Sequence, residues 1–136
     1  MATTTATFTF SEDITDANLS LSNVSTLTQA GTTTGLDTIL RGTKTLTSLT
    51  DVDLINTAAM VTTFAADVST KVYIANTNNS EVDFFTISIG AADGTREEVG
   101  RLYGGDWMFI PWGVDDDITI KPSTATAMTV EYMVLS

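Results

Sequence analysis

The chain of 136 residues contains no cysteine and no histidine. No disulfide can therefore stabilise the fold, and the side chain that titrates nearest neutral pH, also the most common metal ligand, is missing. Without histidine, a serine or threonine nucleophile would need a lysine or a carboxylate as its base. No nucleophile-elbow, phosphate-loop or dinucleotide-binding motif occurs. The sequence predicts a protein that is not an enzyme and that uses no cofactor.

Basic residues are scarce, with 6 Lys and Arg against 17 Asp and Glu, which gives a formal net charge of -11. A surface this acidic repels phosphate backbones and anionic lipids, so neither nucleic acid nor a membrane is an expected partner. Apolar runs fall well short of the ~20 residues of a membrane span. The N-terminal MATTTATFTF lacks the basic start and apolar core of a secretory signal. We therefore expect the protein to be made and used without export.

Carboxylates gather in one run, Asp115 to Asp117. A loop rich in Asp can help to hold Ca²⁺, because hard cations prefer several oxygen ligands. The run lacks the spaced ligands and the bidentate Glu of a calcium loop. Asp also favours turns, where its side chain bonds the local backbone. The run is therefore interpreted as an acidic turn, and no metal site is predicted.

Threonine, valine and isoleucine dominate what is present, and β-branched side chains suit a pleated, half-buried surface. Alternation of apolar and polar residues, as in 5–10, predicts strands. The expected strands cover residues 5–10, 19–27, 43–50, 71–75, 81–89, 98–103, 106–112, 117–121 and 127–135. Val24 is out of phase in the second of these, which predicts a bulge or a bend. Residues 50–64 admit a helix capped by Thr50, but short strands are the favoured interpretation.

Eight or nine short strands with frequent turns predict an all-β, antiparallel sandwich of jelly-roll type. The length fits one domain over residues 1–136, with an extended N-terminal segment over about residues 1–35.

Both tryptophans lie in the stretch GRLYGGDWMFIPWG, residues 100–113. Gly104 and Gly105 suit the positive φ of a tight hairpin between two strands. On the second strand, Trp107 and Phe109 share one face and Trp112 lies on the other, so both faces are apolar. The last expected strand behaves alike, because Met133 and Leu135 make its second face apolar near its end.

A strand with one face toward water should alternate with polar residues, so something covers these second faces. Three explanations remain open: loops of the same chain, an interface with a subunit or partner, or a platform that stacks on sugars. Trp, Tyr and Met are enriched at protein interfaces. The interface candidates are Tyr103, Trp107, Phe109, Trp112, Met133 and Leu135.

The second half of the chain resembles small β-sandwich virion proteins of tailed bacteriophages. The resemblance covers roughly residues 70 to 135, in the order KVYIANTN, FTISIG, GRLYGGDWMFIPW, DITIKP and MTVEYMVL. It is carried by Leu102, Gly105, Asp106, Trp107, Phe109, Ile110 and Pro111, and by Val130, Glu131 and Tyr132.

The resemblance implies a capsid decoration or cement protein, an all-β unit that is often trimeric. Such a protein sits on the outer surface of the virion and clamps the major capsid protein, after synthesis in the cytoplasm of the host bacterium. Cementing needs rigid strands and apolar interfaces but no catalysis. The alternative is a fibre-tip module that binds a receptor or carbohydrate, although the chain has no repetitive shaft.

Overall fold

The computed structural model describes residues 4–11, 20–28, 33, 35–36, 38–61, 63–64 and 70–136. The chain divides into two compact units, residues 1–37 and 38–136, which are described separately. Of the expected N-terminal segment, residues 1–3, 12–19, 29–32 and 34 lie outside this description, including the first residue of the strand expected at 19–27.

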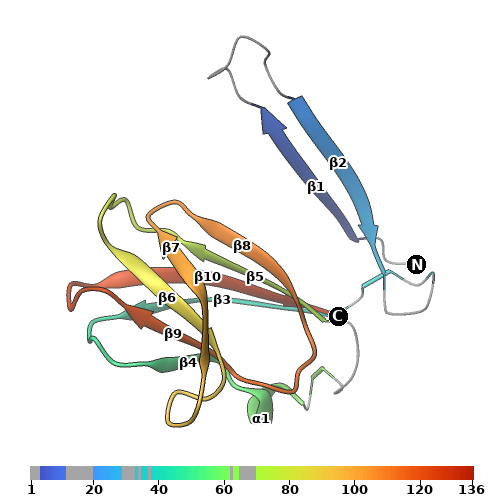
Figure 1. The fold of residues 1–136 in the computed structure, drawn as a ribbon. Coiled ribbons are helices and arrows are strands. Elements are labelled where there is room, and N and C mark those ends of the chain that lie inside the picture. The colour runs from blue at the N-terminus through green and yellow to red at the C-terminus, as the bar shows by residue number, and fades with distance from the viewer. Residues whose placement is uncertain are drawn as a thin grey trace. The chain divides into compact units, whose positions relative to one another are not determined.

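The first unit contains an antiparallel hairpin of two strands, β1 (Thr4–Ser11) and β2 (Ser20–Leu27), drawn in blue in Figure 1. Both strands were predicted from their sequence pattern. The bulge predicted at Val24 is wrong, because the pairing runs without a shift and places Val24 opposite Thr7. Val24 is exposed on the face that carries the threonines of β1. A single apolar residue on this polar face therefore broke the pattern without changing the register.

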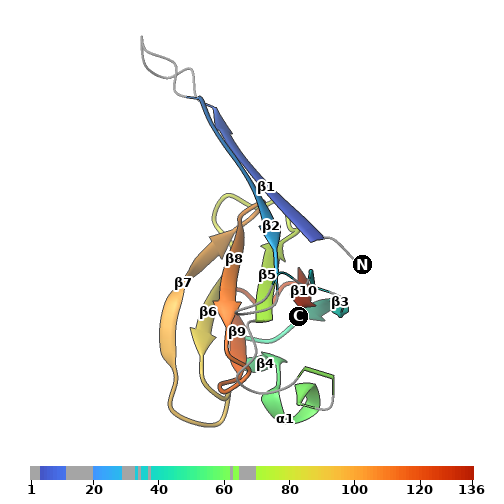
Figure 2. The same ribbon diagram turned by 90° about the vertical axis from the view of Figure 1, so that its right-hand side faces the viewer.

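The described residues of the second unit form eight strands and one short helix. They are β3 (Ile39–Leu46), β4 (Val52–Ile55), α1 (Thr57–Met60), β5 (Thr70–Asn76), β6 (Phe84–Ile89), β7 (Glu97–Tyr103), β8 (Trp107–Trp112), β9 (Ile118–Pro122) and β10 (Met128–Leu135). These strands form two sheets, in the orders β3-β10-β5-β8 and β4-β9-β6-β7. Figures 1 and 2 show the sheets as two facing layers.

Every pairing within these two sheets is antiparallel. Counting the strands of this unit from one to eight gives the orders 1-8-3-6 and 2-7-4-5. The chain thus switches sheet at most connections, and its first and last strands pair with each other. This is the double-sheet arrangement of a jelly roll. The predicted all-β, jelly-roll-like sandwich is confirmed.

The core lies between the two sheets and is filled by alternate residues of both. Ile74 of β5, Phe85 of β6 and Ile120 of β9 are fully buried there. Tyr132 also packs against this core, and the glycine opposite it, Gly42, makes room for the ring. A Cβ at position 42 would lie 2.9 Å from the hydroxyl oxygen of Tyr132. The sequence therefore fits a large inward side chain by leaving its strand partner without one.

The segment for which helix and strand were both considered contains both. It forms strand β4 and then the single turn α1, whose N-cap is Asn56 rather than the expected Thr50. The Asn56 side chain accepts a hydrogen bond from the backbone N–H of Ala59 at 3.2 Å. Residues 62 and 65–69 of this region lie outside the description. Within the described residues, no helix is long and apolar enough to cross a membrane.

Gly104 and Gly105 form a β-turn, but the tight hairpin predicted around them is wrong, since β7 and β8 belong to different sheets. The Asp106 N–H donates to the Tyr103 carbonyl at 2.9 Å, and Gly105 has φ +86°. A positive φ confined to the third residue of the turn is the type II pattern. This type splays the flanking strands instead of matching their twist. The turn therefore carries the chain from one sheet to the other.

Candidate functional site

The most distinctive surface of the second unit is the outer side of the sheet β3-β10-β5-β8. Alternation along β8 turns Trp107, Phe109 and Pro111 away from the core. The register sets Phe109 beside Tyr73 of β5, and Tyr73 beside Met133 of β10. The ring centroids of Tyr73 and Trp107 lie 6.2 Å apart. We call the apolar side chains of this surface the apolar face: Ile39, Tyr73, Trp107, Phe109, Pro111 and Met133.

Several of these large side chains are open to solvent. Trp107 is 52% exposed, Phe109 is 37% exposed, and Ile39, at the start of β3, is 59% exposed. The water-facing side of an antiparallel sheet normally carries polar residues. A contiguous group of exposed aromatic and aliphatic side chains marks an interaction surface.

Polar residues border the apolar face on the side of β3. Arg41 lies opposite Met133, and Thr43 lies opposite Glu131. Each of these positions is outward-facing by alternation along its strand. An apolar centre with a polar rim is the usual anatomy of a protein–protein interface.

The apolar face continues to the border of its sheet, because β8 is the outermost strand there. Edge strands expose backbone groups that can pair with another chain. Pro111 pairs with Lys71 and has no N–H to donate, which suits an edge position. The surface thus joins a flat apolar area to an edge that is partly blocked against continued strand pairing.

The structure brings together three of the six residues predicted as interface candidates. Trp107 and Phe109 share one face of β8, as their alternation indicated, and the register through Tyr73 adds Met133 of β10 to the same face. Leu135 has the same outward register but is only 8% exposed. Three candidates therefore lie on the apolar face. Leu135 points to the same side of the sheet, but its side chain is buried.

Trp112 belongs to the core, where it is 6% exposed. It lies opposite the buried Thr70, on the inward side of β8. Its indole Nε1 donates to the carbonyl of Asp116 at 2.8 Å, so the ring also fixes the following turn. The expected interface role does not apply to Trp112, because alternation along β8 points its side chain into the core, whereas Trp107 points outward.

Tyr103 lies on the other sheet, at the end of β7 opposite Phe84. The two ring centroids are 5.1 Å apart, and Tyr103 is 39% exposed. The β-turn after Tyr103 changes sheet, so this residue is separated from Trp107 although only three residues lie between them. The closeness of Tyr103 and Trp107 in the sequence suggests one aromatic cluster, but the fold places them on different sheets.

The acidic run contains one structural carboxylate and two exposed ones. Asp117 is buried and accepts hydrogen bonds from the Thr57 backbone N–H and hydroxyl, both at 2.7 Å, and from Asn56 Nδ2 at 3.1 Å. Asp115 and Asp116 are exposed. Asp117 therefore joins the turn after β8 to the start of α1. Among the residues described, no group of three or more acidic side chains is arranged to hold a metal ion.

Three members of the apolar face, Ile39, Tyr73 and Pro111, were not among the predicted interface candidates. Tyr73 lies between Val72 and Ile74, so its strand is apolar on both faces, the same signal that drew attention to Trp107. Ile39 precedes the strand expected at 43–50 and had no pattern to mark it. The register across the four strands β3, β10, β5 and β8, which the sequence does not reveal, is what unites the apolar face.

No protein-family model, curated protein or solved structure matches the chain. The function is therefore inferred from the fold, from the apolar face and from the resemblance noted in the sequence.

Proposed function

We propose that the protein is a virion structural protein of a tailed bacteriophage, a capsid decoration or cement protein on the outer shell. The observation that carries this proposal is the exposed apolar face on one sheet of a rigid jelly roll. Jelly rolls are used in viral capsids and in lectins. A structural role requires a stable scaffold and a surface that gains free energy on contact, and both are present.

The contact gains its free energy from the burial of the exposed rings. Full burial of one aromatic or large aliphatic side chain contributes about 2–3 kcal/mol. Trp107 is the strongest candidate anchor, since Trp and Tyr dominate the energetics of protein interfaces. The polar rim from Arg41 to Glu131 then fixes the register of the partner rather than the strength of binding.

In this proposal the chain assembles as a homotrimer. The apolar face reaches the edge strand β8, so the edge of one copy can pack on the face of the next. Contacts of this heterologous kind close into a ring when the rotation between copies is exact. A closed trimer buries the apolar surface of all three copies.

The trimer binds the major capsid protein and lies on the outer surface of the virion. The net charge of -11 supports an outward position, since a protein that lines packaged DNA would be repelled by phosphate. Assembly would take place in the cytoplasm of the host bacterium. When a rigid trimer binds three neighbouring capsid subunits at once, its overall affinity exceeds the affinity of any single contact.

The proposal is tested by co-sedimentation of the full chain with capsid shells that were assembled without it. Wild-type protein is expected to saturate the shells at a fixed number of copies, and Trp107→Ala is expected to weaken binding at least tenfold. Val99→Ser, on exposed β7, is the matched control and should bind as wild type. Absence of saturable binding by the wild-type protein would contradict the proposal.

A further inference from the structure

The outer side of the second sheet, β4-β9-β6-β7, is hollowed into an open groove of about 870 Å³. This volume lies in the range of ligand sites, about 300–1,000 Å³. Its floor includes Thr86 of β6, which lies between Arg101 of β7 and Lys121 of β9 in the register. The residues that line it include Asp51, Phe84, Thr86, Arg96, Arg101 and Lys121.

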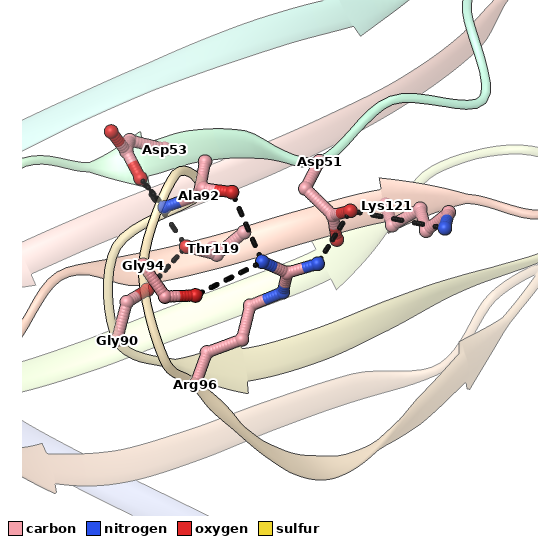
Figure 3. Close-up of polar contacts among 8 residues, drawn as sticks. All are labelled: Asp51, Asp53, Gly90, Ala92, Gly94, Arg96, Thr119 and Lys121. Carbon is pink, nitrogen blue, oxygen red and sulfur yellow. Dashed lines mark hydrogen bonds and ion pairs between the residues drawn. The ribbon is translucent and has the colours of Figure 1, made fainter.

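One wall of the groove is the connection between β6 and β7, which is fixed by several polar contacts (Figure 3). Asp53 Oδ1 accepts from the Ala92 N–H at 2.8 Å and from the Thr119 hydroxyl at 3.3 Å. The Thr119 hydroxyl also lies within hydrogen-bond distance of the Gly90 carbonyl, so its one proton is shared between these two acceptors. The loop is therefore held against the sheet, so that the groove is preformed.

Arg96 fastens the same wall to the side of the groove. Its Nη1 donates to the carbonyl of Ala92 at 3.0 Å, and its Nη2 lies 2.7 Å from Asp51 Oδ2. Lys121 Nζ lies 3.8 Å from the same carboxylate oxygen, as Figure 3 shows. A carboxylate acceptor and two cationic donors are thus placed side by side at one end of the sheet face.

The other wall offers a second pair of this kind. Arg101 Nε lies 3.3 Å from Glu98 Oε1, and the Arg101 guanidinium lies over the ring of Phe84, 4.8 Å from its centroid. Tyr103, the predicted interface candidate that the apolar face does not include, packs beside Phe84 at the rim. The groove therefore combines paired charges and hydroxyls with the ring of Phe84, and the exposed Tyr103 lies beside that ring, outside the groove lining.

We propose that this groove binds a neutral oligosaccharide. A sugar hydroxyl both donates and accepts hydrogen bonds, so it matches a carboxylate and a guanidinium that lie next to each other. Tyr103, beside Phe84 and outside the groove lining, offers an apolar ring face and a hydroxyl to a sugar unit that extends past that end of the groove. An open groove along the strands accommodates a chain of sugar units better than a compact ligand.

The charges favour a neutral ligand over an anionic one. Three of the six cations of the chain line the groove, but Asp51 and Glu98 line it as well. Arg96 and Arg101 each have one of these carboxylates as a partner. The net charge of -11 on the whole chain also opposes the approach of an anion.

This inference does not depend on the decoration role. The groove and the apolar face are on the outer sides of the two facing sheets, and therefore on opposite sides of the sandwich. Burial of the apolar face against other subunits leaves the groove open. A protein on the outer shell would then present its groove to the surroundings, where glycans of a cell surface occur.

The test is an array of neutral glucan, mannan and N-acetylglucosamine oligomers, with sialylated and sulfated oligomers for comparison. The best neutral ligand is then titrated calorimetrically against the full chain. Arg101→Ala removes a donor and Thr86→Trp fills the floor, and each is expected to weaken binding at least tenfold. Val82→Ala, at a site 76% exposed and outside the groove, is expected to bind as wild type.

Lys121→Ala replaces Thr86→Trp if the larger side chain prevents folding, which thermal unfolding reports. Selective binding of neutral oligomers that Arg101→Ala weakens would support the inference. No binding of any oligomer, or binding of anionic oligomers alone, would overturn it. Binding lost in Trp107→Ala and kept in Arg101→Ala would also overturn it, because the sugar would then lie on the apolar face.

Discussion

Single polar residues determine how the connections of this jelly roll are fixed. Asn76 is almost fully buried at the end of β5, and its Nδ2 donates to the Leu102 carbonyl at 2.9 Å. Its backbone carbonyl accepts from the Gly105 N–H at 2.9 Å, and its backbone N–H donates to the Asp106 carbonyl at 2.9 Å. One asparagine thus ties β5 to the turn that carries the chain between the sheets.

Asn76→Ala is expected to lower the free energy of unfolding by about 2–3 kcal/mol. The substitution leaves a buried carbonyl without its donor, and such a group costs about 1–3 kcal/mol. Chemical denaturation measures the loss. Asn79→Ala, at an exposed position in the connection that follows β5, is the matched control and should change stability by less than about 0.5 kcal/mol. Equal effects of the two substitutions would contradict this role for Asn76.

The acidic run after β8 allows a second comparison between neighbours. Asp117→Ala removes the acceptor of three hydrogen bonds from Asn56 and Thr57, and is expected to cost about 2–3 kcal/mol of stability. Asp116→Ala should be close to neutral, because its side chain is exposed and Trp112 bonds only its backbone carbonyl. Urea unfolding of both variants decides the matter. A larger loss in Asp116→Ala would show that the turn is stabilised in another way.

At the scale of elements, the sequence predicted strands well because burial on one side imposes a period of two. β7 begins one residue before the strand expected at 98–103, and β9 is displaced by one residue from the strand expected at 117–121, whereas the strand expected at 43–50 lies four residues beyond β3. The last strand, expected at 127–135, is β10 at Met128–Leu135. Alternation depends only on residues that are close in the sequence, so it predicts a strand regardless of which other strand it pairs with.

Alternation along one strand does not reveal which strands pair or which face of a strand is buried. The sequence separated Trp107 from Trp112 by direction, but nothing in it says which direction is the core. Likewise, Gly104 and Gly105 indicate a turn without saying whether the two strands pair. Both outcomes depend on contacts between residues far apart in the chain, and the apolar face itself is assembled from four such strands.

The connection between β6 and β7 illustrates how one carboxylate orders an element. Asp53→Ala is expected to raise the rate of amide hydrogen exchange at Ala92 at least tenfold, because that N–H loses its acceptor. NMR measures the exchange rate, under conditions in which the variant and the wild type have the same free energy of unfolding. Asp93→Ala, exposed on the same loop, should leave the rate unchanged. Unchanged protection of Ala92 in Asp53→Ala would contradict the fixed wall.

At the scale of the whole molecule, the two sides of the sandwich differ in chemistry. One outer side carries exposed apolar rings, and the other carries a groove with paired charges and hydroxyls. The core between them contains no disulfide, since the chain has no cysteine, and residues such as Ile74, Phe85 and Ile120 are fully buried in it. The proposed account assigns assembly to the first side and recognition to the second.

The most direct test of the central claim is the mass of the purified full chain in solution, measured by light scattering after size exclusion. The account predicts a wild-type mass of three times the 14.5 kDa chain and a monomer for Trp107→Ala. A wild-type monomer at every concentration, or a trimer that Trp107→Ala leaves intact, would contradict the assignment of the apolar face to subunit assembly.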